Sequence, residues 1–309
     1  MTRILNASGC LDALVAPEVA DGLDVFVTKT VTPLPRTGND PIRIAESDVG
    51  MLNSIGLANP GIERFVAAYL PELAMRTPAL WVSVGGFSAE DFALCCAALD
   101  GHACIDVVEL NVSCPNVTAP ADEASAIVAA ARRVTSKPLY AKLSPALPDI
   151  VSVAQAAEQA GAQGLSLTNT LRGLILDPAT LEPILATATG GLSGPALRPV
   201  ALAAVYACAQ ATRLPIVGMG GVETGEHALA LIAAGASDVA LGTVLFGDPA
   251  APRRIRAELE EAAQRYGVAS AAGVFRMAHS DESSASEVSS EPSDRRDSLP
   301  ELTKVAVGS

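Results

Sequence analysis

The chain has 309 residues, half of them hydrophobic, and a formal net charge of −13. This length is sufficient to bury a large core, but no apolar run approaches the roughly 20 residues that a membrane-spanning helix requires, so we expect a soluble protein. The negative charge argues against a nucleic-acid surface, because binding to phosphate backbones requires clustered lysine and arginine.

The amino terminus and the cysteines bear on the compartment. The stretch MTRILNASGC has neither the charged start nor the apolar run of a signal peptide, so we expect the protein in the cytoplasm. The six cysteines form no Cys-x-x-Cys pair and show no cysteine–histidine ligand spacing. The sequence therefore predicts no zinc, iron–sulfur or other metal site in this chain.

Short apolar runs alternate with longer alanine-rich segments of helical period along the first 276 residues. Strands that are apolar on both faces and separated by helices indicate a parallel sheet. Eight such units favour a single-domain (β/α)₈ TIM barrel over residues 1–276, with an open sheet as the alternative. The predicted strands are 3–7, 23–28, 79–84, 105–112, 139–143, 164–168, 215–219 and 239–243, and the predicted helices are 89–99, 121–134, 149–160, 199–212, 225–234 and 252–266.

The composition changes at the carboxyl end of the chain. From Met277 onward, serine, aspartate and glutamate dominate and aromatic residues are absent. Such a segment cannot bury enough apolar surface to fold. We therefore expect an acidic, serine-rich disordered tail over residues 277–309, and a partner-binding role for it is the alternative.

Polar residues follow the carboxyl ends of the predicted strands, where the active site of a TIM barrel lies. The amino-terminal ends carry Pro, Asp and Gly turns instead, and this asymmetry favours a site. The polar segments are 7–9, 28–30, 111–116, 141–145 and 168–170.

Glycine-rich segments occur at 190–194, 218–222 and 241–243. Glycine permits close approach of the backbone, and the N–H groups at a following helix start can bind an anion. Three such segments in the late loops favour a phosphorylated ligand over ordinary turns. None of them is the strand-linked Gly-x-Gly-x-x-Gly of a dinucleotide fold, so we do not expect this chain to bind NAD itself.

Two lysines and four asparagines lie at or near these strand ends. Lys29 and Lys142 could form an imine, neutralise an anion, or face an electron-rich cofactor ring. Amides donate and accept hydrogen bonds in fixed geometry, which suits a flat heterocycle with alternating C=O and N–H groups. The four amides are Asn53, Asn111, Asn116 and Asn169.

The segment ELNVSCPNV contains the candidate general base. His102, His227 and His279 lie outside the polar strand ends, and alternation places Glu109 on another face or deeper in the barrel. Cys114 is the remaining candidate, because a thiolate can accept a proton where cations or dipoles stabilise it. The alternative is an ordinary buried thiol.

From about Asn6 to Tyr266 the chain resembles the cysteine-based, cytosolic class 1 dihydroorotate dehydrogenases. Two of the matching segments, GMLNSIGLANPG and GGLSGPALRPVAL, look most like the NAD-dependent class 1B catalytic subunit, which pairs with a subunit carrying FAD and a 2Fe–2S cluster. The other matching segments are VTKTVTPLPRTGNDPIR, ELNVSCPNV, AKLSP, TNTLRG, GMGGVETG and LGT.

The resemblance implies an FMN-dependent oxidation of (S)-dihydroorotate to orotate in pyrimidine biosynthesis. Cys114 would remove the C5 proton while hydride passes from C6 to the flavin. A homodimer, or a heterotetramer with the FAD and iron–sulfur subunit, is implied as well. The implied substrate-binding residues are Lys29, Asn53, Ile55, Gly56, Leu57, Asn111, Asn116, Asn169 and Thr170. The implied FMN-binding residues are Ala7, Ser8, Lys29, Thr30, Asn111, Lys142, Gly194, Gly220, Gly221, Gly242 and Thr243.

Three other functions remain open from the residues. A related flavin enzyme could act on another dihydropyrimidine, and a degenerate paralogue could bind flavin without turnover. An unrelated phosphate-binding barrel lyase could use Lys142 to form an imine.

Overall fold

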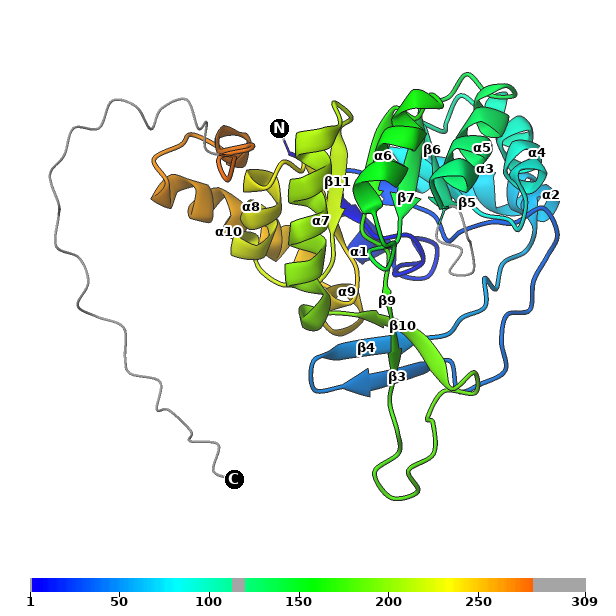
Figure 1. The fold of residues 1–309 in the computed structure, drawn as a ribbon, viewed down its shortest axis with the longest axis horizontal. Coiled ribbons are helices and arrows are strands. Elements are labelled where there is room, and N and C mark those ends of the chain that lie inside the picture. Colours follow the sequence, from blue (N-terminus) through cyan, green and yellow to red (C-terminus); the bar gives the residue numbers. More distant parts are fainter. Residues whose placement is uncertain (1, 113–119, 280–309) are drawn as a thin grey trace, which may run out of the picture. The chain divides into compact units, whose positions relative to one another are not determined.

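Eight parallel strands form the central sheet of the protein (Figure 1), in the spatial order β1-β12-β11-β8-β7-β6-β5-β2. The structure is a computed structural model that describes residues 2–112 and 120–279. All eight predicted strands are present. They are β1 (Ile4–Asn6), β2 (Phe26–Val27), β5 (Leu80–Val84), β6 (Val107–Val112), β7 (Leu139–Leu143), β8 (Gly164–Leu167), β11 (Ile216–Met219) and β12 (Asp238–Leu241).

The two edge strands of this sheet, β1 and β2, meet and close a barrel. One parallel bridge joins Leu5 to Val25. The side chain of Asn6 then replaces the next part of the ladder, because its Oδ1 accepts from the Val27 N–H at 2.8 Å and its Nδ2 donates to the Val27 carbonyl at 2.7 Å. The predicted TIM barrel is therefore confirmed, and the open-sheet alternative is wrong.

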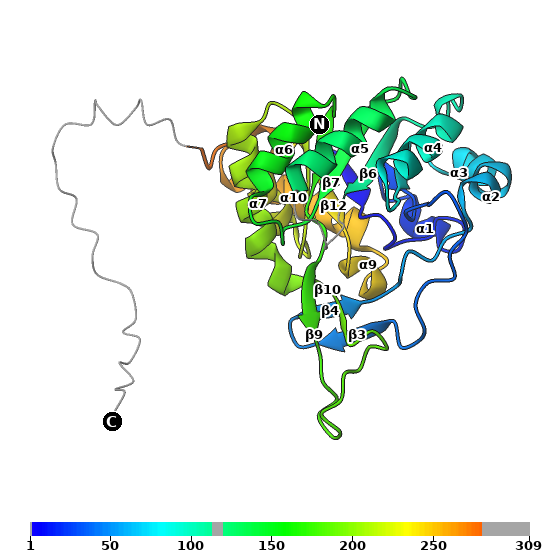
Figure 2. The same ribbon diagram turned by 45° about the vertical axis from the view of Figure 1, so that its right-hand side comes forward.

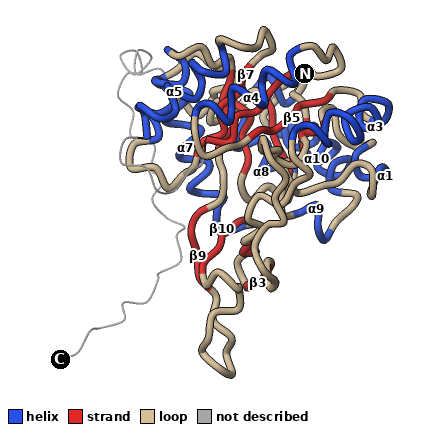
Figure 3. Tube along the Cα trace, turned by 90° about the vertical axis from the view of Figure 1, so that its right-hand side faces the viewer, coloured by secondary structure: helices blue, strands red, loops and turns tan. Residues whose placement is uncertain are grey.

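Helices surround the barrel on its outside (Figures 1 and 3). Several begin at a residue whose side chain accepts a hydrogen bond from a free backbone N–H of the first turn, as Ser88, Asp149 and Thr224 do. The six predicted helices correspond to α4 (Ala89–Asp100), α5 (Pro120–Arg132), α6 (Ile150–Gln159), α7 (Arg198–Ala211), α8 (Gly225–Ala233) and α10 (Ala251–Arg265).

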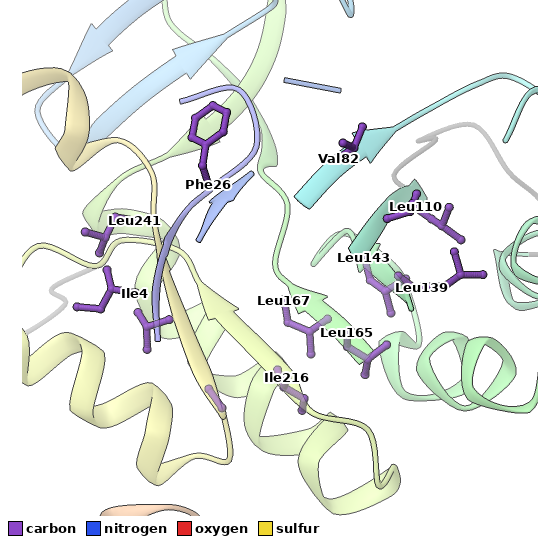
Figure 4. Close-up of a cluster of buried hydrophobic side chains, with 14 of the residues drawn as sticks. Ile4, Phe26, Val82, Leu110, Leu139, Leu143, Leu165, Leu167, Ile216 and Leu241 are labelled. Carbon is purple, nitrogen blue, oxygen red and sulfur yellow. The ribbon is translucent and has the colours of Figure 1, made fainter. Parts of the chain in front are cut away.

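The barrel strands are buried on both faces, because alternate residues point outward to the helices and inward to the barrel axis. Figure 4 shows part of the outward layer, including Leu110, Leu143 and Leu165. A separate apolar cluster contains Trp81 and Tyr140, whose ring centroids lie 4.6 Å apart. Alternation assigns this cluster to the barrel interior, so apolar side chains fill the inside of its amino-terminal half.

A small antiparallel sheet, which the sequence analysis did not predict, lies beyond the carboxyl ends of the barrel strands (Figures 1 and 2). Its strands pair in the order β3-β4-β10-β9. Two of them come from the connection between β2 and β5, and the other two from the connection between β8 and α7. Their bounds are β3 (Ile44–Ser47), β4 (Gly50–Asn53), β9 (Leu171–Leu174) and β10 (Thr189–Ser193).

Short helices complete the described chain. After η3 (Ala271–Val274), the backbone N–H groups of Arg276 and Ala278 donate hydrogen bonds to the carbonyls of Ile232 and Ala233 at the end of α8. Residues 280–309 lie outside the described residues, so the tail and the domain boundary at 276 stay predictions. In the described ranges no helix has the length and apolar character needed to cross a membrane. The short helices are α1 (Pro17–Ala20), α2 (Ile62–Arg64), η1 (Phe65–Tyr69), α3 (Leu70–Arg76), η2 (Pro195–Leu197), α9 (Val244–Gly247) and η3 (Ala271–Val274).

Candidate active site

A cavity of ≈ 530 Å³ lies between the carboxyl ends of the barrel strands and the small sheet. Every described residue that the sequence analysis assigned to a site lines it, although their roles stay predictions. Cys114 and Asn116 fall in the segment 113–119, outside the described residues. The lining residues assigned from the sequence are Ala7, Ser8, Lys29, Thr30, Asn53, Ile55, Gly56, Leu57, Asn111, Lys142, Asn169, Thr170, Gly194, Gly220, Gly221, Gly242 and Thr243.

Two amides in the cavity wall are hydrogen-bonded to each other. Asn169 donates from Nδ2 to Oδ1 of Asn111 at 3.0 Å, and Asn111 donates from its own Nδ2 to Thr30 Oγ1 at 3.3 Å. The Oδ1 of Asn169 accepts from the backbone N–H of Thr170 at 2.8 Å. These contacts orient both amide planes before any ligand binds.

The hydroxyl group of Thr30 contacts two further hydroxyl groups, those of Ser8 and Ser83. Ser8 donates to the carbonyl of Thr28 at 2.8 Å and lies 3.3 Å from Thr30 Oγ1. The same Thr30 oxygen lies 3.1 Å from Ser83 Oγ. Since Thr30 and Ser83 are buried, these bonds hold the amide network to three barrel strands.

The small sheet supplies the opposite wall of the cavity. Asn53 on β4 donates to the carbonyl of Gly191 at 3.3 Å. The next loop turns at Gly56 and Leu57, which have φ values of +72° and +56°. A Cβ at Gly56 would lie 2.4 Å from Asn39 Oδ1, so the loop requires glycine there.

The two lysines have different electrostatic surroundings. Burial and the neighbouring charge of Lys142 lower the pKa of Lys29, while Cys10 opposes the shift. Lys142 is buried and lies 3.7 Å from a carboxylate oxygen of Glu109. The sequence placed Glu109 either on another face or deeper in the barrel. The structure places it deeper in the barrel, where it is buried and does not line the cavity.

Glycine loops form another part of the wall. Gly194, Gly220 and Gly221 have φ values of +94°, +133° and +68°. A Cβ at Gly221 would lie 2.7 Å from the carbonyl oxygen of Gly194, so the two loops touch through their backbones. Next to them, Thr243 donates to Ser193 Oγ at 2.8 Å. Backbone N–H groups in such closely packed glycine loops can bind the phosphate group of a ligand.

Several lining residues escaped the sequence analysis, among them Cys10, Arg172 and Glu223. Cys10 follows the first strand within ASGC and Arg172 lies in TNTLRG, so position after a strand was a usable signal for both. Burial raises the pKa of the Cys10 thiol, and the lysines Lys142 and Lys29 act in the opposite direction. Glu223 lies 3.5 Å from Arg198, and both side chains of this ion pair are partly exposed.

Comparisons with known proteins agree on one family. A family model described as dihydroorotate dehydrogenase matches residues 2–262. The catalytic subunit of dihydroorotate dehydrogenase B (NAD(+)) from Listeria monocytogenes serotype 4b (strain CLIP80459) is 42% identical over 280 residues, which cover 86% of this chain and 91% of that protein. A subunit of the same name from Pelobacter propionicus is 44% identical with the same coverage. A putative dihydroorotate dehydrogenase A (fumarate) from Solibacter usitatus is 43% identical over 255 residues, with 80% and 84% coverage.

A solved structure has the same fold. The crystal structure of DHODH from Eimeria tenella in complex with ferulenol superposes with a TM-score of 0.75 and covers 90% of this chain and 85% of that one. Its sequence identity is 24%. At this identity the likeness concerns the fold alone.

Proposed function

The chain belongs to the dihydroorotate dehydrogenase family, and we propose that it catalyses the flavin-dependent oxidation of dihydroorotate to orotate in pyrimidine biosynthesis. The observation that carries this proposal is one cavity lined by oriented amides, two lysines and backbone-exposing glycine loops. The amides suit a planar pyrimidine. The lysines suit its carboxylate and an electron-rich ring.

The substrate is proposed to lie against the amide network. Asn111 and Asn169 are fixed by their mutual hydrogen bond, so their remaining polar atoms can recognise ring C=O and N–H groups without further ordering. Lys29 from the loop after β2 neutralises the carboxylate. Asn53 and the backbone of the loop at Gly56 close the site from the small sheet.

FMN is the proposed cofactor, and the chain's own residues fit it. Thr168 Oγ1 is buried without a hydrogen bond inside the described ranges, and Thr168 lines the cavity. The loops at Gly194, Gly221 and Gly242 line the cavity and are proposed to hold the phosphate through their backbone N–H groups. The bound flavin would accept hydride. Lys142 is proposed to face its ring.

Cys114 is the proposed general base. In the oxidation, C5 of the substrate loses a proton and C6 loses a hydride, so the protein must supply a proton acceptor beside C5. Within residues 2–112 and 120–279, Glu223 is the carboxylate that lines the cavity, and it is paired with Arg198. We assign the proton transfer to Cys114 from the resemblance of ELNVSCPNV to the family, and the thiolate would take up the C5 proton.

We assign NAD as the final electron acceptor through a partner subunit. Relatives from Listeria monocytogenes and Pelobacter propionicus are named as catalytic subunits of the NAD(+) enzyme, and a catalytic subunit implies a second subunit. FAD and a 2Fe–2S cluster belong on that partner in this proposal. A homodimer of this chain would form the centre of a cytoplasmic heterotetramer. The fumarate-type relative supplies the competing acceptor.

Anaerobic addition of dihydroorotate to the purified yellow protein tests the function directly. The proposal expects loss of the flavin absorption band and formation of orotate. A flavin band that stays unchanged would favour a flavin-binding protein without turnover, and bleaching by another dihydropyrimidine alone would favour the related enzyme. Borohydride trapping of substrate on Lys142 would support the lyase.

A further inference from the structure

Side chains from three outer helices hold the loop that follows β11. Gly221 and Glu223 of this loop line the cavity. The carbonyl of Gly221 accepts from Nη1 of Arg198 at 3.2 Å, and the carbonyl of Glu223 accepts from Nη1 of Arg254 at 3.1 Å. The backbone N–H of Glu223 donates to Nδ1 of His227 at 3.2 Å. The conformation of the loop at residues 221–223 therefore depends on α7, α8 and α10.

One ring nitrogen of His227 connects this loop to α7. Its Nδ1 lies 2.9 Å from Arg198 Nη1 as well as 3.2 Å from the backbone nitrogen of Glu223. A guanidinium group and a backbone amide can only donate, so Nδ1 must accept from both, and the neutral ring carries its proton on Nε2. A proton on Nδ1 would remove this acceptor and place a positive charge beside Arg198.

The position of His227 in α8 normally requires no titratable group. His227 is the third helical residue, and its own N–H donates to the capping Thr224 Oγ1 at 3.3 Å. In a capping box a glutamate or glutamine at this position reaches back to the backbone N–H of the capping residue. Here an imidazole reaches back to the preceding residue, Glu223, and so ties the cavity wall to a group whose charge changes in the acid range.

Burial and the positive charge of Arg198 lower the pKa of His227, and the neighbouring glutamates act in the opposite direction. The neutral ring that the hydrogen bonds require is therefore also the form that the surroundings favour. The charged groups that surround the ring or bind its partners are Arg198 from α7, Glu223 from the loop, Glu226 from α8, and Arg254 and Glu258 from α10.

We propose that His227 is a positioning residue whose unprotonated Nδ1 holds the loop at residues 221–223 in the form that binds the cofactor phosphate, and that protonation of this atom weakens cofactor binding. Arg198 is the second part of the arrangement, because its Nη1 bonds both His227 and the Gly221 carbonyl. The inference rests on the proposed function for the identity of the ligand, whereas the hydrogen bonds of the loop are independent of it.

The flavin-free wild-type protein provides the first test. NMR of isotope-labelled histidine distinguishes a protonated ring nitrogen from an unprotonated one, and the signals of His227 are those missing from His227→Asn. We expect the neutral ring to carry its proton on Nε2 and to gain the Nδ1 proton below the ordinary pKa of 6.5. The backbone amide of Glu223 should lose protection from hydrogen exchange over the same pH range. A neutral ring with its proton on Nδ1, or protection that does not follow the titration, overturns the proposal.

Two substitutions of His227 provide the second test. In His227→Asn the side-chain oxygen can occupy the place of Nδ1 as an acceptor that does not titrate, whereas His227→Leu has no acceptor. At neutral pH we expect the dissociation constant of FMN to rise about tenfold in His227→Leu, the scale of one lost hydrogen bond, and to change little in His227→Asn. Quenching of flavin fluorescence measures it.

The same titrations in acid separate a pH-dependent role from a merely structural one. Wild-type binding should weaken toward that of His227→Leu as His227 becomes protonated, while His227→Asn should keep its affinity. The comparison is made as the ratio of variant to wild type at each pH, because the ligand phosphate titrates in this range too. A ratio between wild type and His227→Asn that is constant with pH contradicts the proposal, and this ratio decides the matter alone if His227→Leu does not fold.

His102→Leu, the same change in the turn after α4 and outside the cavity lining, is the matched control and should bind FMN as the wild type does. Equal binding by His227→Leu and the control overturns the role of His227 and leaves the proposed function intact. A wild-type protein that binds no FMN at any pH would overturn the proposed cofactor together with this inference.

Discussion

Asn169, on the loop after β8, donates a hydrogen bond to the side-chain oxygen of Asn111 on β6 across 3.0 Å. Asn111 donates in turn to Thr30, after β2, at 3.3 Å. Residues from three separate parts of the barrel thus fix one another. The orientation of both amide planes is therefore fixed in the protein without a ligand.

Replacement of Asn169 by leucine tests this arrangement. Leucine has a similar volume but cannot donate, so Asn111 Oδ1 loses the hydrogen bond from Asn169 and the substrate loses an amide. We expect kcat/KM for dihydroorotate to fall about tenfold to a hundredfold, since such bonds contribute roughly 1–3 kcal/mol. Steady-state kinetics measures the change. Thr170→Ser, which keeps the neighbouring hydroxyl, is the control, and equal losses in both variants would argue against a specific role for the amide.

Removal of the proposed base should slow the proton transfer. In Cys114→Ala we expect flavin reduction by dihydroorotate to fall by a factor on the order of 10² or more, measured by stopped-flow absorbance under anaerobic conditions. Cys104→Ala changes an exposed cysteine and should reduce at the wild-type rate. Reduction of Cys114→Ala at that same rate would make Cys114 a structural thiol.

The glycine loops predict a cofactor defect. In Gly221→Ala the new Cβ would lie 2.7 Å from the Gly194 carbonyl oxygen, at a residue whose φ is +68°. The loops must separate, so we expect purified protein with much less flavin per chain, read from its absorbance spectrum. Gly101→Ala adds the same methyl group where nothing lies within 4 Å. Full flavin content in Gly221→Ala would remove these loops from the proposed phosphate site.

The lowered pKa of Lys29 gives substrate binding a pH dependence. Only the protonated lysine attracts the carboxylate of orotate, so orotate affinity should decline as pH rises through this pKa, below the ordinary value of 10.5. The same shift acts on stability with the opposite sign. Between the lowered pKa of Lys29 in the folded protein and its ordinary pKa in the unfolded chain, the unfolded chain binds more protons. The contribution of Lys29 to the free energy of unfolding therefore increases as pH rises through this range. Spectral titration with orotate measures the affinity. Lys29→Met should bind weakly at every pH, and a decline preserved in that variant would assign it to another group.

The barrel was predictable because its strands carry a local signal. Segments such as 139–143 are apolar and bounded by turns, and they are buried on both faces whatever their neighbours are. The small sheet lacks that signal. Its strand β4 reads GMLN and β10 reads TGGLS, and Asn53 and Gly191 meet although 138 residues separate them. Such glycine-containing strands depend on tertiary pairing, which no local pattern reveals.

The location of the site could be predicted from the sequence, because the topology of a parallel barrel alone determines it. Parallel strands bring their carboxyl ends to one place, so Lys29, Asn111 and Lys142 could be grouped without coordinates. The partnership of Lys142 with Glu109 could not, because it depends on the register between β6 and β7. Alternation showed only that Glu109 lies elsewhere.

The barrel closure predicts a stability loss at a position remote from the chemistry. In Asn6→Ala the backbone N–H and carbonyl of Val27 lose their buried partner. We expect the free energy of unfolding to fall by about 2–5 kcal/mol, from two unsatisfied buried groups, measured by urea denaturation. Gln264→Ala removes an exposed amide on α10 and should change little. A loss no greater than that of the control would show that β1 and β2 hold together without the Asn6 side chain.

The junction of β1 and β2 links ligand binding to hydrogen exchange. The bridge between Leu5 and Val25, two hydrogen bonds between Ile4 and Asp24, and the Asn6 side chain join these strands. The segments that follow them carry Ser8 and Thr30 into the cavity. A ligand that contacts both segments would connect β1 to β2 on the side of the cavity. The amides of β1 and β2 should therefore exchange fastest among the barrel strands of the empty protein and slow most on loading. A cofactor bound at the proposed site would therefore stabilise the junction between the two strands that close the barrel around it.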